Sequence, residues 1–249
     1  MVQGLFIISM HLQYLKRFYP DFKNKKILDL GCGRGDFLLE CHKEKIDVIG
    51  IDINPNYIKI SKEKIKGNGF EPNIIQGRGE ELPFEDNYFD FVNCVDVLEH
   101  TQNPQKVLSE IYRVLKKGGR TFITIQNRLS VRDGHYNLLF INWMPRFLGK
   151  IYGKSIRGDK NPYHCPDIHE LDEMHYYTYF RFKKIAKELG FRIEDTRKNQ
   201  LNNPDLILNK RFKNFVLVFK KIKLDFIIDL FYSILKNFYF NTFHLILIK

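Results

Sequence analysis

Two carboxylates and an imidazole follow an apolar run at residues 89–95 in the spacing D-x-x-E-H, as Asp96, Glu99 and His100. The run "FDFVNCV" is typical of a buried strand, and the carboxyl ends of such strands line the ligand edge of a parallel sheet. His100 can act as a general base with Asp96 as a second catalytic residue, or all three can bind a divalent ion that acidifies a hydroxyl. Alternatively, Glu99 and His100 only fasten the loop by hydrogen bonds to the backbone. The sequence leaves these three interpretations open.

A glycine-rich turn lies nearer the N-terminus, in "KKILDLGCGRGDFLLE" at residues 25–40. A short apolar run ends at Asp29 and Leu30, and glycines stand at positions 31, 33 and 35. Glycine lets a backbone approach a ligand closely and adopt a positive φ. A strand, a glycine turn and a helix N-terminus form the cofactor cradle of doubly wound sheets.

The glycine spacing indicates which ligand this cradle holds. A dinucleotide fingerprint needs glycine at position 36, where this chain has Asp, so we expect a ligand without a diphosphate. Asp52 ends the next apolar run 21 residues after Gly31 (52 − 31), close to the spacing at which an acid meets ribose hydroxyls. We therefore expect an adenosine.

Strand and helix signals alternate along the chain. The strands show little polar alternation, which predicts a parallel sheet covered on both faces. The expected strands are 27–30, 47–53, 72–77, 89–97, 120–127, 191–198 and 243–249. The expected helices are 36–45, 54–70, 103–119, ending at its two glycines, 177–191 and 224–240.

Five sequence blocks occur in an order and spacing that resemble the class I S-adenosylmethionine-dependent methyltransferases, over roughly residues 25–197. The blocks are "ILDLGCGRG", "VIGIDINPNYI", "GRGEELPFEDNYFDFV", "DVLEHTQNPQKVLSEIYRVLKKGG" and "ITIQNR". The resemblance implies an α/β fold with a Rossmann-like, doubly wound seven-stranded sheet. That sheet would be mostly parallel, with an antiparallel last strand and helical insertions.

The resemblance also implies the cofactor contacts. The methionine part of S-adenosylmethionine would meet Asp29, Gly31, Cys32 and Gly33. Asp52 would bind the ribose hydroxyls, Ile53 would pack on the adenine, and Val95 would lie beneath the sulfonium. In "GRGEELPF" the family often has an Asp where this chain has Arg78, and Glu80 is the expected substitute near the adenine.

A divalent metal is a further implication of the resemblance. Some ubiquinone-pathway O-methyltransferases and small-RNA 3′-end methyltransferases carry an E-x-x-E-H metal cluster. The D-x-x-E-H run is similar, with Asp96 in place of the first Glu. The expected ligands are then Asp96, Glu99 and His100.

The composition indicates which partners and which cellular compartment to expect. The formal net charge of +11 favours nucleic acid, anionic lipid or a phosphorylated substrate, or else only keeps the surface soluble. The four cysteines form no CxxC pair, which favours a reducing cytoplasm. The N-terminus lacks the pattern of a signal peptide, and no apolar run is long enough for a confident membrane span.

Two segments depart from the strand–helix alternation. Residues 126–177 are expected to form the acceptor-site insertion, as the resemblance implies, and contain the single tryptophan, Trp143. Their apolar residues could form a lid, a loop that dips into a membrane or a second small core. Their histidines, His135, His164, His169 and His175, fit no zinc spacing.

Residues 198–241 are expected to form a basic and apolar helical insertion between the last two strands. Within 224–240, four polar residues form one narrow stripe at near-helical spacing: Asp225, Asp229, Ser233 and Lys236. A wide apolar face beside basic residues suits an anionic membrane surface. The alternative is a helix buried in a homodimer interface or against the sheet.

We therefore expect a single methyltransferase domain over residues 1–249. Its acceptor would be a hydroxyl on a small, lipid-linked or polysaccharide-precursor molecule, since surface-polysaccharide methyltransferases are also similar. Its site would be the cytoplasm, at the periphery of the inner membrane face. The alternatives are an RNA or other nucleic-acid methyltransferase and a cofactor-binding module that has lost catalysis.

Overall fold

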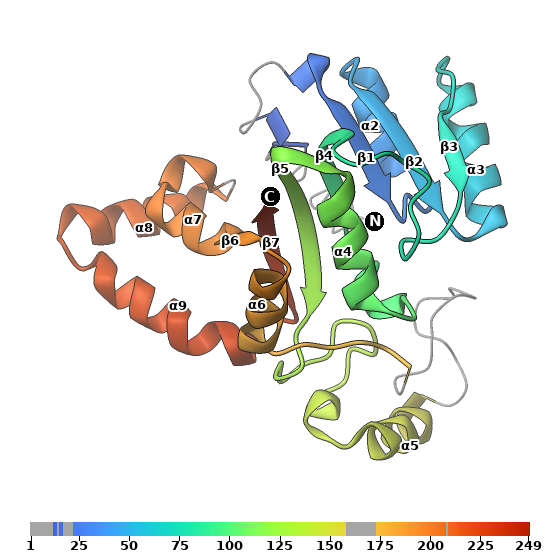
Figure 1. The fold of residues 1–249 in the computed structure, drawn as a ribbon. Helices are drawn as coiled ribbons and strands as arrows, with labels where there is room; N and C mark the ends of the chain where they lie inside the picture. The colour runs from blue at the N-terminus through green and yellow to red at the C-terminus, as the bar shows by residue number, and fades with distance from the viewer. Residues whose placement is uncertain (1–11, 14, 17–21, 158–172, 208) are drawn as a thin grey trace. The chain divides into compact units, whose positions relative to one another are not determined.

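The computed structural model describes residues 12–13, 15–16, 22–157, 173–207 and 209–249 (Figure 1). Contacts between residues divide the chain into two compact units. Unit 1 comprises the described residues of 1–124, 185–192 and 247–249, and unit 2 those of 125–184 and 193–246.

The strands form one seven-stranded sheet in the order β3-β2-β1-β4-β5-β7-β6. Their bounds are β1 Lys26–Leu30, β2 Asp47–Asp52, β3 Ile74–Gln76, β4 Phe89–Cys94, β5 Leu115–Gln126, β6 Arg192–Asp195 and β7 Thr242–Ile248. The pairs from β3 through β5 are parallel. Backbone bonds join Gly118 to Lys249 and Asn127 to Asn241, so β7 runs antiparallel to β5. The expected fold class is confirmed.

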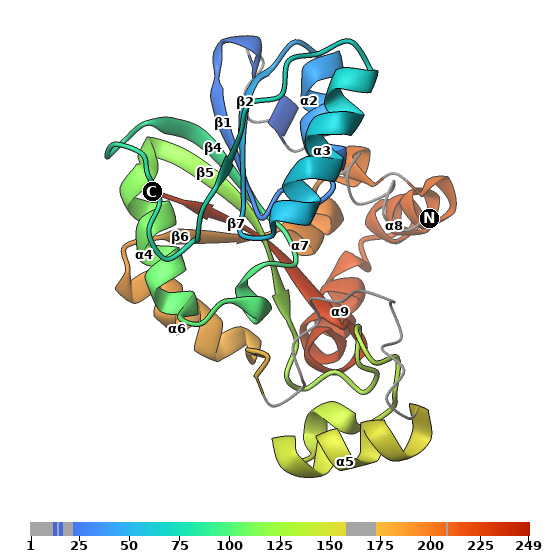
Figure 2. The same cartoon turned by 90° about the vertical axis from the view of Figure 1, so that its right-hand side faces the viewer.

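Three helices of unit 1 connect the parallel strands: α2 Asp36–Lys43, α3 Pro55–Gly67 and α4 Pro104–Val114. Asparagine caps and a proline in the first turn start α3 and α4, because the Asn54 and Asn103 side chains accept backbone N–H groups there. In Figure 2, α2 and α3 lie on one face of β1–β3 and α4 lies on the other. The short 3-10 helix η1 Phe22–Asn24 precedes β1, and η2 Leu98–His100 lies between β4 and α4.

The boundary between α4 and β5 differs from the expectation that Gly118 and Gly119 end the helix. Leu115 already has an extended backbone and pairs with Phe89 of β4. Gly118 and Gly119 instead exchange backbone hydrogen bonds with Lys249. Pairing within the sheet therefore ends the helix a turn early, at Val114.

Helices also dominate the chain beyond β5. They are η3 Ile141–Trp143, α5 Arg146–Arg157, α6 Tyr179–Glu188, α7 Thr196–Asn202, η4 Pro204–Leu206, α8 Lys210–Lys221 and α9 Asp225–Tyr239. The expected strand 191–198 stops at Asp195, because the Asp195 carboxylate accepts the backbone N–H groups of Arg197 and Lys198 and so caps α7.

Unit 2 contains two small apolar clusters of its own. Leu138, Ile141, Met174 and Tyr176 form one, and Leu201, Ile207 and Val216 form the other. The expected insertions, 126–177 and 198–241, both fall within unit 2, and their functional roles remain predictions. By contrast α9 has no buried residue, so the interpretation that it is buried against the sheet is wrong. In the described part of the chain, no helix combines the length and apolarity needed to cross a membrane.

Candidate cofactor and active site

The three glycines after β1 all have positive φ, at 70° for Gly31, 50° for Gly33 and 76° for Gly35. Their surroundings differ. A Cβ on Gly31 would lie 2.3 Å from Val97 Cγ2, and one on Gly35 would lie 2.0 Å from Ser61 Oγ. A Cβ on Gly33 would meet nothing nearer than 4.0 Å. Gly31 and Gly35 therefore allow close packing, whereas Gly33 borders open space that a ligand can fill.

Asp52 connects the end of β2 to this glycine turn. Its Oδ2 accepts the N–H of Gly33 at 2.8 Å and its Oδ1 accepts the N–H of Asn54 at 2.8 Å. Each carboxylate oxygen has a second acceptor position, so Asp52 can also accept ribose hydroxyls. The neighbouring Ile53 is 55% exposed and offers an apolar surface of the kind an adenine ring packs on.

Asp29 is buried at the end of β1, where Asn93 Nδ2 donates a 2.7 Å hydrogen bond to its Oδ1. Burial raises the pKa of the Asp29 carboxyl to about 7, and the hydrogen bond from Asn93 opposes this rise. The sequence analysis missed Asn93, although a polar residue inside the apolar run "FDFVNC" was a usable signal. Asn93 pairs with Asp29 across β1 and β4, which is why the two side chains meet.

Cys32 contributes its backbone to the turn rather than its thiol. Its N–H donates to the carbonyl of Ile51 at 3.1 Å, and its buried Sγ lies 3.0 Å from where a Cβ of Gly50 would stand. Burial raises the pKa of the Cys32 thiol well above its usual value, which keeps it protonated. Its expected place at the cofactor therefore rests on the backbone.

Glu80 fastens the loop that leads into α4. Its Oε1 accepts the N–H groups of Gln102 at 2.9 Å and Asn103 at 3.2 Å. Arg78 Nη1 donates to Gln102 Oε1 at 3.2 Å, so both residues hold the same loop. These contacts give Glu80 a structural role, and its contact with an adenine remains a prediction.

Asp96 is held by β5, a contact that the sequence analysis did not anticipate. Its N–H donates to Thr124 Oγ1 at 2.7 Å, and the Thr124 hydroxyl donates back to Asp96 Oδ1 at 3.0 Å. Its φ is +53°. Within the described part of unit 1, the ligand atoms of Asp96 do not gather with those of Glu99 and His100 within 4.8 Å. This arrangement of side chains does not support a divalent ion bound by Asp96, Glu99 and His100 together, and that ligand set remains a prediction.

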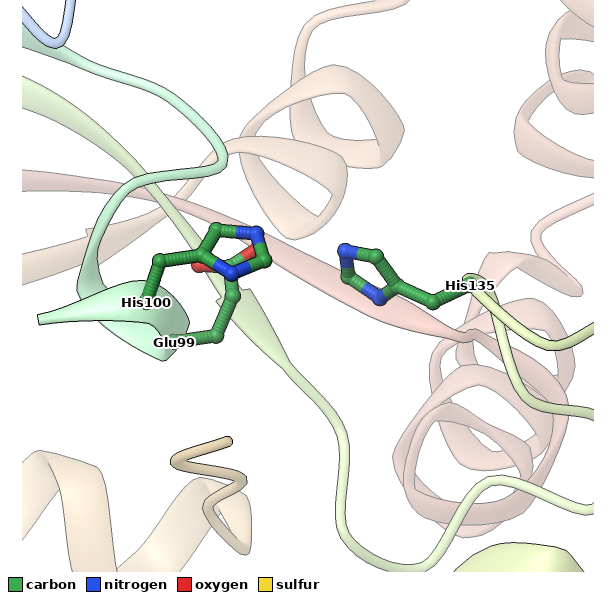
Figure 3. Close-up of side chains that lie close together, drawn as sticks. All are labelled: Glu99, His100 and His135. Atoms are coloured by element: carbon green, nitrogen blue, oxygen red, sulfur yellow. The ribbon is translucent and has the colours of Figure 1, made fainter. Parts of the chain in front are cut away.

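Glu99 and His100 extend from η2, as Figure 3 shows. Glu99 is buried and His100 is half-buried, and a carboxylate oxygen of Glu99 lies within 4.8 Å of a ring nitrogen of His100. Val95 is half-buried at the end of β4, and its place beneath the sulfonium remains a prediction.

His135, also drawn in Figure 3, belongs to unit 2. There its backbone N–H donates to Asp133 Oδ1 at 2.9 Å, and its ring Nδ1 lies 3.3 Å from the Tyr176 hydroxyl. His164 and His169 lie outside the described residues.

Comparison with known proteins matches residues 28–123 to the methyltransferase domain family. Demethylmenaquinone methyltransferase of Staphylococcus carnosus is 31% identical over 193 residues, which are 71% of this chain and 79% of that protein. The Lactococcus lactis enzyme of the same name is 36% identical over 62% of this chain and 65% of its own. The ubiquinone/menaquinone biosynthesis C-methyltransferase UbiE of Vibrio cholerae is 38% identical over 43% of this chain and 45% of its own.

Solved structures support the same fold. The YcgJ protein of Bacillus subtilis superposes with a TM-score of 0.54 at 17% identity, over 96% of this chain and 95% of that one. A SAM-dependent methyltransferase of Archaeoglobus fulgidus gives a TM-score of 0.51 at 22% identity, over 97% and 94%. At these identities the likeness shows the fold alone.

Proposed function

Because the chain belongs to the class I S-adenosylmethionine-dependent methyltransferases, we propose that it methylates a ring carbon of a lipid-linked, quinone-type acceptor. The observation that carries this proposal is the alignment with demethylmenaquinone methyltransferases. In Staphylococcus aureus such a relative is 30% identical over 79% of this chain and 89% of its own. The proposal replaces the hydroxyl acceptor expected from the sequence, since the named relatives include C-methyltransferases.

The residues after β1 and β2 fit the cofactor. Gly33 borders open space, and the Asp52 carboxylate lies 2.8 Å from the Gly33 N–H, so an acceptor for ribose hydroxyls stands beside that space. When bound, S-adenosylmethionine supplies an electrophilic methyl group on a sulfonium. Asp29 and the backbone of Gly31 to Gly33 would hold its methionine part. An ammonium group beside Asp29 would lower the pKa of that carboxyl and so favour its charged form.

His100 is the residue that we propose handles the proton. Methylation replaces the hydrogen of a ring carbon with a methyl group, so one proton is released overall. The ring becomes a better nucleophile when its hydroxyl is deprotonated, and His100 would accept that hydroxyl proton. The hydroxyl would be restored by a proton when the methylated ring carbon loses its own. The Glu99 carboxylate within 4.8 Å of the His100 ring would stabilise the imidazolium. Asp96 would act as a positioning residue, because its bonds to Thr124 fix the loop between β4 and η2.

The test is a reaction of the full chain with methyl-labelled S-adenosylmethionine and a reduced, demethylated quinone that carries a polyprenyl tail. Tandem mass spectrometry then places the label on the product. We expect the label on a ring carbon, and much less product with His100→Ala. A label on oxygen would contradict carbon methylation. Labelled RNA with no labelled quinone would favour the nucleic-acid alternative instead.

A further inference from the structure

Helix α9 turns its apolar side away from the protein. Its large exposed residues begin at Phe226 and continue as adjacent pairs every four positions, which places them on one broad face: Phe226, Leu230, Phe231, Ile234, Leu235, Phe238 and Tyr239. A helix on a globular protein ordinarily packs such a face against the core. Here that face is exposed over most of four turns.

The opposite side of α9 makes the polar contacts with the rest of unit 2. The Tyr232 hydroxyl donates to the Asp195 carboxylate at 2.7 Å, and Asp229 lies 3.7 Å from Lys198 Nζ in an ion pair. Tyr232 also packs on the cluster of Leu201, Ile207 and Val216. The orientation of α9 is therefore fixed by specific contacts, and the outward position of its apolar face follows from them.

Helix α5 shows the same arrangement. Its inward side is small, since Gly149 and Gly153 are buried and a Cβ on Gly153 would lie 3.6 Å from Ile141. Its outward side carries Phe147, Leu148 and Ile151, which are all exposed. Two helices of unit 2 thus present large apolar side chains to the outside.

An aromatic cluster links the two helices. Trp143 ends η3, three residues before α5 begins, and its ring lies 5.3 Å from the ring of Phe140 and 6.4 Å from that of Phe238 on α9. Trp143 is 51% exposed, and Phe140 and Phe238 are also exposed. We call this set the outer apolar surface: Phe140, Trp143, Phe147, Leu148 and Ile151 together with the seven exposed residues of α9.

The charge of the adjoining segments indicates what covers this surface. Helix α8, which packs on α9, has five Lys or Arg among its twelve residues and no acidic residue. Helix α5 has four and likewise no acidic residue. Two copies joined through this surface would bring like charges together, whereas anionic lipid headgroups would attract the basic residues.

We propose that the outer apolar surface docks on an anionic lipid bilayer. The helices lie in the headgroup region with their apolar side chains in the acyl boundary, as interfacial amphipathic helices do. Trp143 and its aromatic neighbours sit at the interface, where such rings are favoured. This inference concerns unit 2 alone and holds whichever acceptor the enzyme methylates.

Trp143 makes a direct test available, because it is the only tryptophan of the chain. The full chain is mixed with vesicles of phosphatidylcholine, with or without phosphatidylglycerol, that carry brominated acyl chains. We expect a blue shift and quenching of the Trp143 emission with the anionic vesicles, both reduced by added salt. Unquenched emission would overturn the proposal. A blue shift that grows with protein concentration without lipid would overturn it in favour of a dimer.

Matched variants test whether the outer apolar surface is the part of the protein that contacts the vesicle. Phe231→Glu and Ile234→Glu change exposed side chains, so the fold is retained, and each should weaken vesicle binding about tenfold. Ile60→Glu on α3 of unit 1, at a position 41% exposed, is the control and should bind vesicles like the unmodified chain. Equal losses in all three variants would contradict the assignment to this surface. Cofactor binding, measured on the same samples, reports separately on the methyltransferase site.

Discussion

Gly31, Gly33 and Gly35 share a left-handed backbone, but their neighbours differ, so two of them allow close packing and one borders the expected ligand site. Val97 fills the space beside Gly31 and Ser61 fills the space beside Gly35, while Gly33 borders open space and the Asp52 carboxylate. The spacing of the glycines predicted the cradle. It could not tell which glycine faces the ligand, because that depends on side chains from elsewhere in the chain.

Alanine substitutions should separate these roles. Gly33→Ala incurs only the left-handed backbone strain, roughly 1–2 kcal/mol, and should chiefly weaken cofactor binding. Gly35→Ala adds a clash with Ser61 and should lower the free energy of unfolding by about 2–5 kcal/mol. Urea denaturation measures both. Equal losses of stability would show that the space beside Gly33 is not open.

Asp29 should make stability depend on pH. Its pKa rises from 3.8 in the unfolded chain to about 7 in the folded protein, so the folded state holds its proton more tightly. Stability from this group is fully present below pH 3.8 and is lost as the pH rises towards 7, at up to about 1.4 kcal/mol per pH unit.

Asp29→Asn should remove this slope, as denaturation curves across that pH range would show. Asp47→Asn, which changes an exposed carboxylate at the start of β2, is the control and should leave the slope in place. An unchanged slope in Asp29→Asn would show that Asp29 ionises normally.

His100→Ala should lower kcat by about 10²–10⁴-fold and leave the Kd of the cofactor unchanged, because a general base acts on the acceptor. Added imidazole should restore part of the rate, which a merely structural histidine would not allow. His42→Ala on α2, whose ring stacks on Phe70, is the matched control. Unchanged turnover would remove His100 from the chemistry.

At the scale of elements, the apolar runs and the Pro and Gly signals were enough to predict the parallel strands, α2, α3, α6 and α9. They failed where a contact distant in sequence decides the boundary. Pairing with Phe89 starts β5 at Leu115, and the side chain of Asp195 converts the end of an expected strand into α7. The thin polar stripe of α9 was visible in the sequence, but its inward direction follows from Asp195 and Lys198.

The bond from Tyr232 to Asp195 should anchor α9. Tyr232→Phe removes the hydrogen bond to the Asp195 carboxylate and should lower the free energy of unfolding by about 1–2 kcal/mol. The loss stays small because Asp195 keeps its bonds to the backbone N–H groups of Arg197 and Lys198. Tyr239→Phe changes a tyrosine that is 73% exposed and should have no effect on urea denaturation. If both variants unfold alike, the contact does not hold the helix.

At the scale of the whole molecule, the sequence identified the family and the sheet, and it left the acceptor open. Cofactor contacts come from short motifs with fixed spacing, whereas acceptor contacts depend on segments that differ between enzymes of one fold. The net charge of +11 was ambiguous by itself. The structure places basic helices α5 and α8 in the same unit as the outer apolar surface, which gives part of that charge a specific use.

The central claim is that S-adenosylmethionine binds between the glycine turn and Asp52. Calorimetric titration of the cofactor into the full chain tests it most directly. We predict one site per chain and an affinity loss of about 10–100-fold in Asp52→Ala, equivalent to about 1.5–3 kcal/mol for a charged acceptor. Asp47→Ala, at the opposite and exposed end of β2, should bind as the unmodified chain does. Equal affinity in Asp52→Ala, or no heat of binding in the unmodified chain, would contradict the account.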